Sequence, residues 1–203
     1  MENLYLVYIA IFTYLCGSIP SAYLLARVMK NIDIRKYGSG NVGSTNALRT
    51  LGLKGALISL LFDILKTILA LSLPFYLKAP QIAFYISGFA VVCGHNWPIF
   101  LHFKGGKGVA VSATMIVLFF PWIGILSLVI LVAVVWLTRF VSLGSLLMSL
   151  FWPLMLVANG AALTDVYFAG CLTLLIWFLH RGNIQRLLTH SERKISFHKS
   201  EQV

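Results

Sequence analysis

Charged residues are scarce in this sequence, and acidic residues are the scarcest. Only 11% of the 203 residues are Asp, Glu, Lys or Arg, and 6 of them are acidic, whereas 59% of the residues are hydrophobic. With a mean hydropathy of +0.88, such a chain cannot cover a globule with polar surface in water. We therefore predict an integral membrane protein.

Cysteine is scarce too, and the spacing of the cysteines argues against both disulfides and structural zinc sites. The three cysteines show neither a CxxC pair nor a Cys/His ligand spacing, and each lies in or beside an apolar run: Cys16, Cys93 and Cys171. Disulfides and structural zinc are therefore not expected. The cysteines are interpreted as small packing residues.

Basic residues outnumber acidic ones by 16 to 6, which gives a net charge of +10. A nucleic-acid-binding protein gathers its basic residues on a soluble face. Here the basic residues separate apolar runs instead. We expect membrane lipid around the chain and no nucleic acid as a partner.

Six apolar segments are candidates for membrane spans, at about 4–26, 55–77, 82–103, 109–137, 141–160 and 164–180. Roughly 20 residues cross the hydrocarbon core as a helix, so the fourth segment is long for one span and short for two. Residues 120–124 supply turn residues in its middle. The start of the chain lacks a basic n-region and a cleavage site, so we expect the first segment to remain as a span.

The placement of Lys and Arg favours seven spans over six. With seven spans and the N-terminus outside, 14 of the 16 basic residues lie inside, Lys66 lies within a span and Lys78 alone lies outside. Six spans leave 8 inside and 7 outside, against the positive-inside rule. We predict an all-α integral membrane domain over 1–203, with the N-terminus outside, a cytoplasmic C-terminus, some short helices, and inside segments at about 27–54, 94–108, 138–145 and 180–194.

Asp63 and Lys66 lie three residues apart on one face of the second predicted span. An ionisable pair within a membrane helix suggests a functional role. Mutual neutralisation inside the helix bundle is the favoured explanation of the pair, and its role stays open.

The first inside segment contains a glycine-rich stretch that suits a phosphate. Glycines allow tight turns that direct backbone N–H groups to one point, and hydroxyl and amide side chains add neutral donors. The predicted binding residues are Gly38, Ser39, Gly40, Asn41, Gly43, Ser44, Thr45 and Asn46, flanked by Arg35 and Arg49. The spacing also fits GxGxxG, but no strand or βαβ unit accompanies it, so a dinucleotide site is rejected. A flexible solvated loop is the simpler alternative.

The second inside segment predicts another oxyanion or phosphate site. Lys104 and Lys107 enclose the turn Gly105-Gly106, close to the start of a helix near residue 109, and helix N-termini attract anions. A membrane anchor would explain the two lysines but not the glycines or the nearby His95. The segment does not match a Walker A loop.

The last two inside segments give weaker signals. Arg139 and Ser142 lie near one helix end, where capping and orientation explain them as well as binding does. His180 and Asn183 follow the last span, and Arg186 lies in a short interfacial helix, where it would snorkel or pair with a lipid phosphate.

Several reaction types are excluded by missing residues. The inside face has only three acidic residues, Asp33, Glu192 and Glu201, so no magnesium or other metal site is expected. No histidine has an Asp five positions later, as in many acyl-thioester-dependent acyltransferases, and no GxSxG elbow is present. What remains is a basic, amide-rich site that positions phosphorylated molecules at the inner leaflet.

Three stretches together resemble the bacterial acyl-phosphate:glycerol-3-phosphate acyltransferase (PlsY) family. They cover most of the chain and comprise Gly17-Ser18-Ile19-Pro20-Ser21-Ala22-Tyr23 with residues 38–46, then Gly94-His95 with residues 103–108, then His180 with Asn183-Ile184-Gln185-Arg186. Departures are Trp97, Leu179 and His190, where the family usually has Phe, Arg and Gly.

The resemblance implies transfer of a fatty acyl group from acyl phosphate to the 1-hydroxyl of glycerol 3-phosphate, the first step of phospholipid synthesis. It implies a place in the bacterial cytoplasmic (inner) membrane, with no covalent acyl-enzyme, no cofactor and no obligatory protein partner. The 38–46 loop would hold the acyl phosphate, and Lys104 would serve its phosphate and the carbonyl oxyanion. Catalytic roles are expected for Lys104, His95 and Asn46. Glycerol 3-phosphate would be held by Arg49, Ser142, His180 and Asn183.

Three questions stay open at this point. The proton acceptor is either His95 or the donor's own phosphate dianion. A transporter of phosphorylated solutes would use similar basic loops, although it needs polar residues on both faces. A non-catalytic membrane scaffold is the third option, which the glycine-rich loops disfavour.

Overall fold

The computed structural model describes residues 4–195, which form nine α-helices, two short 3-10 helices and no strand. The elements are α1 (Leu4–Ser18), α2 (Ser21–Lys30), η1 (Ile34–Lys36), α3 (Ser44–Tyr76), α4 (Gln81–Asn96), η2 (Ile99–Leu101), α5 (Val109–Phe119), α6 (Pro121–Thr138), α7 (Val141–Ala158), α8 (Leu163–Leu179) and α9 (Arg181–Leu188). The all-helical prediction is confirmed for these residues. They divide into two compact units, over residues 4–111 and 112–195, and the single-domain arrangement stays a prediction.

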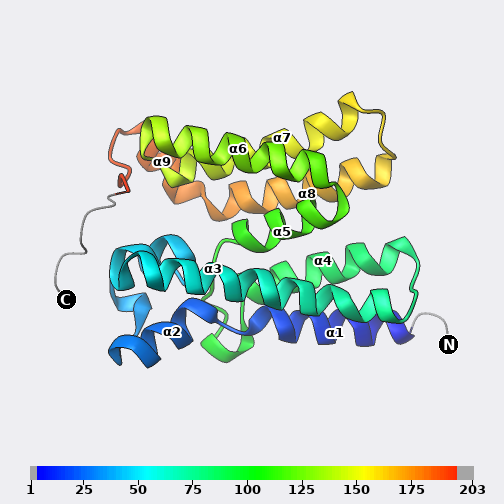
Figure 1. Cartoon of the computed structure of the whole chain (residues 1–203), viewed down its shortest axis with the longest axis horizontal. Coiled ribbons are helices and arrows are strands. Elements are labelled where there is room, and N and C mark those ends of the chain that lie inside the picture. Colours follow the sequence, from blue (N-terminus) through cyan, green and yellow to red (C-terminus); the bar gives the residue numbers. More distant parts are fainter. Residues whose placement is uncertain (1–3, 196–203) are drawn as a thin grey trace. The chain divides into compact units, whose positions relative to one another are not determined.

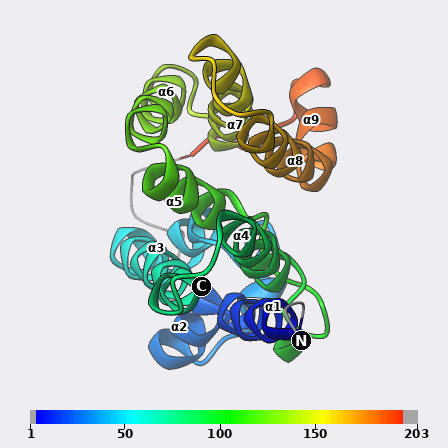
Figure 2. The ribbon, with the colours of Figure 1, turned by 90° about the vertical axis from the view of Figure 1, so that its right-hand side faces the viewer.

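The first unit is built on α1, α3 and α4, which lie side by side (Figures 1 and 2). α1 and α4 approach closely at two glycines. A Cβ on Gly17 would lie 2.2 Å from the carbonyl oxygen of Val91, and a Cβ on Gly94 would lie 2.2 Å from that of Tyr14. Close backbone approach at small residues is typical of membrane helices, since lipid provides little hydrophobic drive for their association.

Two breaks in the first unit produce polar helical pieces at the end of the spans. Pro20 separates α1 from α2, because proline lacks an N–H and cannot continue a helix. Gly52 has φ 77° and ψ −174°, which interrupts α3. Residues 44–51 therefore form a separate helical stretch, and the span predicted at 55–77 begins after the break.

The second unit packs α6 against α7 and α7 against α8, with α9 beside α7 and α8 (Figure 2). Trp152 is fully buried and its indole N–H donates to the hydroxyl of Ser127 at 2.9 Å. The hydroxyl of Thr173 donates to the carbonyl oxygen of Ser149 at 2.7 Å. These bonds join α6 to α7 and α7 to α8.

The break predicted within 109–137 is confirmed. α5 ends at Phe119 and α6 begins at Pro121, a position where proline's missing N–H costs no hydrogen bond. Among the described residues, five helical stretches are long and apolar enough to span a membrane, or six if α8 and α9, which are bent by 63°, count as one span. At 11 residues, α5 is a shorter apolar helix, so the number seven and the orientation stay predictions.

Candidate functional site

The side chain of Asn46 holds the 38–46 loop together from inside. It is 1% exposed. Its amide nitrogen lies 3.1, 3.1 and 2.9 Å from the carbonyl oxygens of Ile34, Tyr37 and Asn41, and its oxygen accepts the backbone N–H of Ser39 at 2.8 Å. The side chain is therefore fully engaged with loop backbone, which is the geometry of a positioning residue.

Gly38 is required at its place in this loop. Its φ is +60°, and a Cβ there would lie 2.2 Å from the side-chain oxygen of Asn46. Gly38, Ser39 and Gly40 are exposed, whereas Asn41, Gly43, Ser44, Thr45 and Arg49 are partly buried. Ser44 and Thr45 form the first turn of α3, where backbone N–H groups lack intrahelical partners.

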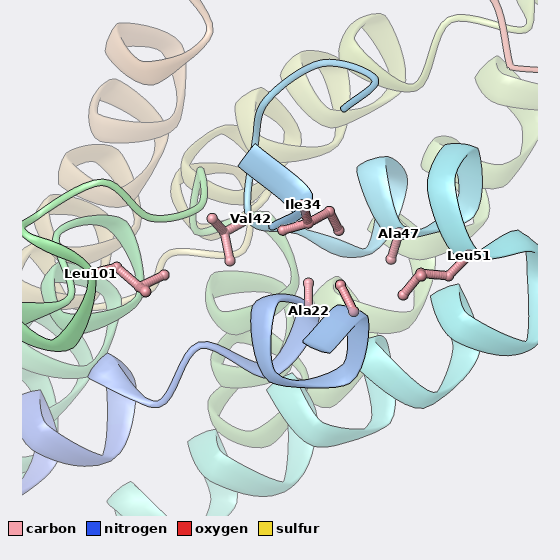
Figure 3. Packing of buried hydrophobic residues seen from close by; sticks show 7 residues of the cluster. Ala22, Ile34, Val42, Ala47, Leu51 and Leu101 are labelled. Atoms are coloured by element: carbon pink, nitrogen blue, oxygen red, sulfur yellow. The ribbon is translucent and has the colours of Figure 1, made fainter. Parts of the chain in front are cut away.

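A compact apolar cluster supports the loop (Figure 3). Its side chains come from α2, η1, the loop, the first turns of α3, and η2: Ala22, Ala26, Ile34, Val42, Ala47, Leu51 and Leu101. Because Leu101 precedes the second glycine-rich segment, the cluster brings both segments into one part of the first unit.

Arg35, predicted to flank the phosphate loop, is paired with an acidic neighbour. Its guanidinium donates to both oxygens of Asp33, at 3.0 and 2.7 Å. The hydrogen bond from Arg35 lowers the pKa of Asp33 to about 2, against the opposing effect of burial. Arg35 also lies over the ring of Tyr23. The charge of Arg35 is thus largely neutralised by Asp33, within the same segment.

The 104–108 loop folds back onto the end of α4. The N–H of Gly105 donates to the carbonyl oxygen of Asn96 at 3.1 Å, and that of Gly106 donates to the carbonyl oxygen of His95 at 2.9 Å. A Cβ on Gly105 would lie 2.2 Å from the same His95 oxygen. Lys104 is exposed and Lys107 is partly buried.

Asn96 lies beneath the end of this loop. It is 3% exposed, and neither its side-chain oxygen nor its nitrogen has a hydrogen-bond partner in the described structure. A Cβ on Gly108 would lie 3.0 Å from that oxygen. The side-chain oxygen of Asn41, in the other loop, is also buried without a partner. Unsatisfied buried polar atoms of this kind often await a ligand or water.

His95 belongs to a buried polar network with the ion pair of α3. The ammonium of Lys66 lies 2.9 Å from a carboxylate oxygen of Asp63 and 3.0 Å from Nδ1 of His95. The hydroxyl of Ser21 donates to the same oxygen of Asp63 at 2.6 Å. The sequence placed Asp63 and Lys66 on one face but did not indicate that they meet His95.

In the second unit, three predicted or neighbouring polar side chains converge on Glu192. Its carboxylate accepts hydrogen bonds from the hydroxyl of Ser142 at 2.9 Å, the amide of Asn183 at 2.7 Å and Nε of Arg186 at 2.7 Å. Arg186 thus pairs with a carboxylate of its own chain, whereas the sequence predicted that it would snorkel or pair with a lipid phosphate. The sequence contained no signal for Glu192 beyond its being one of two acids in a basic tail.

The pKa of Glu192 reflects this arrangement. Burial raises it, but the hydrogen bonds from Asn183, Arg186 and Ser142, with the charge of Arg186, leave the pKa below its ordinary value. The cluster therefore stabilises an oxyanion.

His180 lies at the junction of α8 and α9 and is 4% exposed. Its Nδ1 lies 2.8 Å from the carbonyl oxygen of Ile176. A carbonyl can only accept, so Nδ1 carries a proton. Among the described residues, no three His, Cys, Asp or Glu side chains are grouped as they would be around a metal ion.

Known proteins with similar sequences belong to one enzyme family. The family model for glycerol-3-phosphate acyltransferase matches residues 7–190. The chain is 44% identical over 192 residues to a glycerol-3-phosphate acyltransferase of Thermoanaerobacter sp. (strain X514), covering 95% of this chain and 96% of the relative. It is 40% identical over 190 residues to one from Bacillus subtilis (strain 168), covering 92% and 96%.

Solved structures agree. A crystal structure of PlsY, an integral membrane glycerol 3-phosphate acyltransferase, in its glycerol 3-phosphate form superposes with a TM-score of 0.88 at 33% identity, covering 94% of this chain and 96% of that one. The lysophosphatidic acid form gives 0.86 at 32% identity, covering 95% and 96%. The transporter and scaffold alternatives find no support in these matches. The chain belongs to the glycerol-3-phosphate acyltransferase family.

Proposed function

We propose that this membrane glycerol-3-phosphate acyltransferase takes its acyl group from acyl phosphate and works on the cytoplasmic face of the inner membrane. The 1-hydroxyl oxygen of glycerol 3-phosphate attacks the acyl carbon, and the bond from that carbon to the phosphate oxygen breaks. The products are lysophosphatidic acid and inorganic phosphate. Acyl phosphate is a mixed anhydride, so its phosphate leaves without a strong protein acid.

The observation that carries the donor assignment is the unsatisfied amide of Asn96. It is buried beside Gly108, at the start of α5, in the loop that carries Lys104. A helix N-terminus, a lysine and an unpaired amide together suit a phosphate oxygen. The 38–46 loop, with the unpartnered oxygen of Asn41, lies in the same unit. In this proposal Lys104 and Lys107 hold the phosphate from one side. Gly105 and Gly106, whose N–H groups donate to the carbonyl oxygens of Asn96 and His95, shape the turn between the two lysines.

Glycerol 3-phosphate is assigned to Ser142, His180 and Asn183, which all lie in the second unit. Ser142 and Asn183 already bind a carboxylate, that of Glu192, which supports their affinity for an oxyanion. Two clamped phosphates would supply most of the rate by orienting the hydroxyl and by stabilising the charge that develops on the carbonyl oxygen.

Two residues take different roles from those the sequence suggested. Asn46 uses its side chain within its own loop, so it positions the loop and does not touch substrate. In the described residues the loops offer few carboxylates, and Asp33 is paired with Arg35. His95, the other proton acceptor that the sequence left open, already contacts the ammonium of Lys66 through Nδ1. We therefore assign the hydroxyl proton to the departing phosphate.

The donor is tested with purified protein, glycerol 3-phosphate and either palmitoyl phosphate or palmitoyl thioester, following phosphate release and lysophosphatidic acid together. Equal amounts of both products from the acyl phosphate alone are expected. Product from the thioester alone would overturn the donor assignment while leaving the family intact.

The orientation is tested by labelling single cysteines in intact cells, in a background without Cys16, Cys93 and Cys171. Lys78 and Ser191 are both exposed. A membrane-impermeant maleimide should label Lys78→Cys directly and Ser191→Cys only after permeabilisation. The reverse pattern would refute the cytoplasmic site.

A further inference from the structure

We propose that Asp63 and Lys66 are positioning residues that fix the proton of His95 on Nε2, so that His95 serves as a hydrogen-bond donor beneath the 104–108 loop and not as a base. The inference deepens the proposed function, because it concerns the loop that binds the donor phosphate. Its spectroscopic test does not depend on the identity of the donor.

The surroundings of Lys66 require its charged form. Three acceptors lie near the nitrogen: the carbonyl oxygen of Ile19 at 2.9 Å, a carboxylate oxygen of Asp63 at 2.9 Å and Nδ1 of His95 at 3.0 Å. An ammonium has three N–H donors and a neutral amine has two. The ammonium therefore satisfies all three contacts, and one N–H points to His95.

The opposite assignment, with a proton on Nδ1 of His95 directed at a neutral amine, is disfavoured by charge. If His95 were also neutral, the carboxylate of Asp63, which is 1% exposed, would have no cation beside it, at the cost of an unpaired charge within a membrane span. If His95 were the cation, the proton would sit on an imidazole 3.0 Å from an amine that is ordinarily far more basic. Nδ1 also lies 3.5 Å from the carboxylate oxygen of Asp63, but a proton on Nδ1 would face the nearer ammonium of Lys66 at 3.0 Å. Nδ1 of His95 is thus an acceptor.

Neutral imidazole carries one proton, so this proton lies on Nε2. Nε2 faces the loop, because a Cβ on Gly106 would lie only 2.0 Å from it. His95 is 7% exposed and also holds the loop through its carbonyl oxygen, which accepts the N–H of Gly106 at 2.9 Å. A ring with Nε2–H toward the loop can donate to an anion there, but it has no lone pair with which to take a proton from the glycerol hydroxyl.

Ser21 completes the network from α2. Its hydroxyl donates to the carboxylate oxygen of Asp63 that also faces Lys66. Three transmembrane or interfacial elements, α2, α3 and α4, therefore meet at a fixed arrangement of protons directly below the loop.

The first test is ¹⁵N NMR of protein labelled at histidine, with the His95→Gln variant to assign the His95 signals. We expect an unprotonated Nδ1 and a protonated Nε2 in the native protein. In Lys66→Met, the carboxylate of Asp63 should draw a proton to Nδ1. A protonated Nδ1 in the native protein would overturn the inference, whatever the donor proves to be.

The second test separates positioning from mere charge neutralisation. Lys66→Met alone leaves a buried charge and risks misfolding, so the decisive variant is Asp63→Asn/Lys66→Met, in which both charges are removed. We expect its thermal stability to recover toward that of the native protein while kcat/KM for acyl transfer stays about 100-fold low, since small displacements at a reacting site cost that much. Lys66→Arg, which keeps a donor, should recover part of the activity.

Ser59→Ala is the matched control, because Ser59 is fully buried on the same helix and its hydroxyl has no partner in the described structure. It should retain native kinetics. If the double variant regains native kcat/KM together with its stability, the pair serves burial alone and the inference fails.

Discussion

Gly106→Ala should damage the enzyme by collision with His95. The added Cβ would lie 2.0 Å from Nε2, 2.7 Å from Cδ2 and 2.9 Å from Cε1 of that ring. Ordinary contact begins at about 3.4 Å. The ring has little freedom to retreat, because the ammonium of Lys66 holds its other edge through Nδ1. The loop must therefore move by more than 1 Å.

Overpacking of this kind costs about 1–3 kcal/mol of stability. A displacement of about 1 Å in a substrate-positioning segment costs about 100-fold in rate. We expect a lower unfolding temperature and a kcat/KM reduced about 100-fold. Scanning fluorimetry in detergent and phosphate release from acyl phosphate measure the two effects on the same preparation.

Two further variants make the test specific. Gly170→Ala is the matched control, because its Cβ would have no neighbour within 4 Å, and alanine in a helix interior is favoured over glycine by about 0.5–1 kcal/mol. In the double variant Gly106→Ala/His95→Ala the collision is absent, so its stability should equal that of His95→Ala alone. Additive losses in the double variant, or native activity in Gly106→Ala, would refute the steric argument.

Three other changes test other parts of the molecule. Asn46→Asp replaces the amide donors facing three carbonyl oxygens with a carboxylate. The free energy of unfolding should therefore decrease by about 1–3 kcal/mol, and acyl transfer should fall. Native thermal stability would show that the loop does not depend on this side chain. Ser127→Ala leaves the buried indole N–H of Trp152 without its acceptor and should cost about 1–2 kcal/mol in thermal unfolding with little change in kcat/KM. The pKa of Glu192 is lowered in the folded protein, so its contribution to stability is present above the ordinary carboxyl pKa and is lost as pH falls through the folded pKa. On acidification below about pH 4.5, the unfolding temperature of Glu192→Gln should therefore fall less than that of the native protein. Equally steep falls in the two proteins would contradict this prediction.

Patterns with a local physical cause could be predicted from the sequence. The break at Phe120 was marked by Pro121 in a segment too long for one span, and the structure has it there. The glycine-rich loops could be located because glycine, lysine and small polar residues interrupt apolar runs. Helical spans follow from length and hydropathy, since backbone groups in lipid must be satisfied within the segment.

Contacts between distant segments could not be predicted in the same way. Glu192 meets Ser142 across 50 residues of sequence, and no periodicity links a tail carboxylate to the start of α7. Arg35 and Asp33 are two residues apart, yet their pairing depends on the turn of η1. The sequence predicted Asn46 as a substrate contact, because an amide side chain can donate to a phosphate. Only the folded loop shows that its four contacts are internal.

Both glycine-rich loops are built on the same physical arrangement. In each, a buried polar side chain lies directly under a glycine, so close that an added Cβ would collide with it. A Cβ on Gly38 would lie 2.2 Å from the side-chain oxygen of Asn46, and a Cβ on Gly106 would lie 2.0 Å from Nε2 of His95. Glycine at these positions is thus needed for close approach of a side chain, in addition to any freedom of the backbone. Apolar residues in place of Asp63 and Lys66 would pack α3 equally well and would avoid the cost of burying charge in a membrane helix. They would not fix the proton of His95, however, and this role accounts for the charged pair.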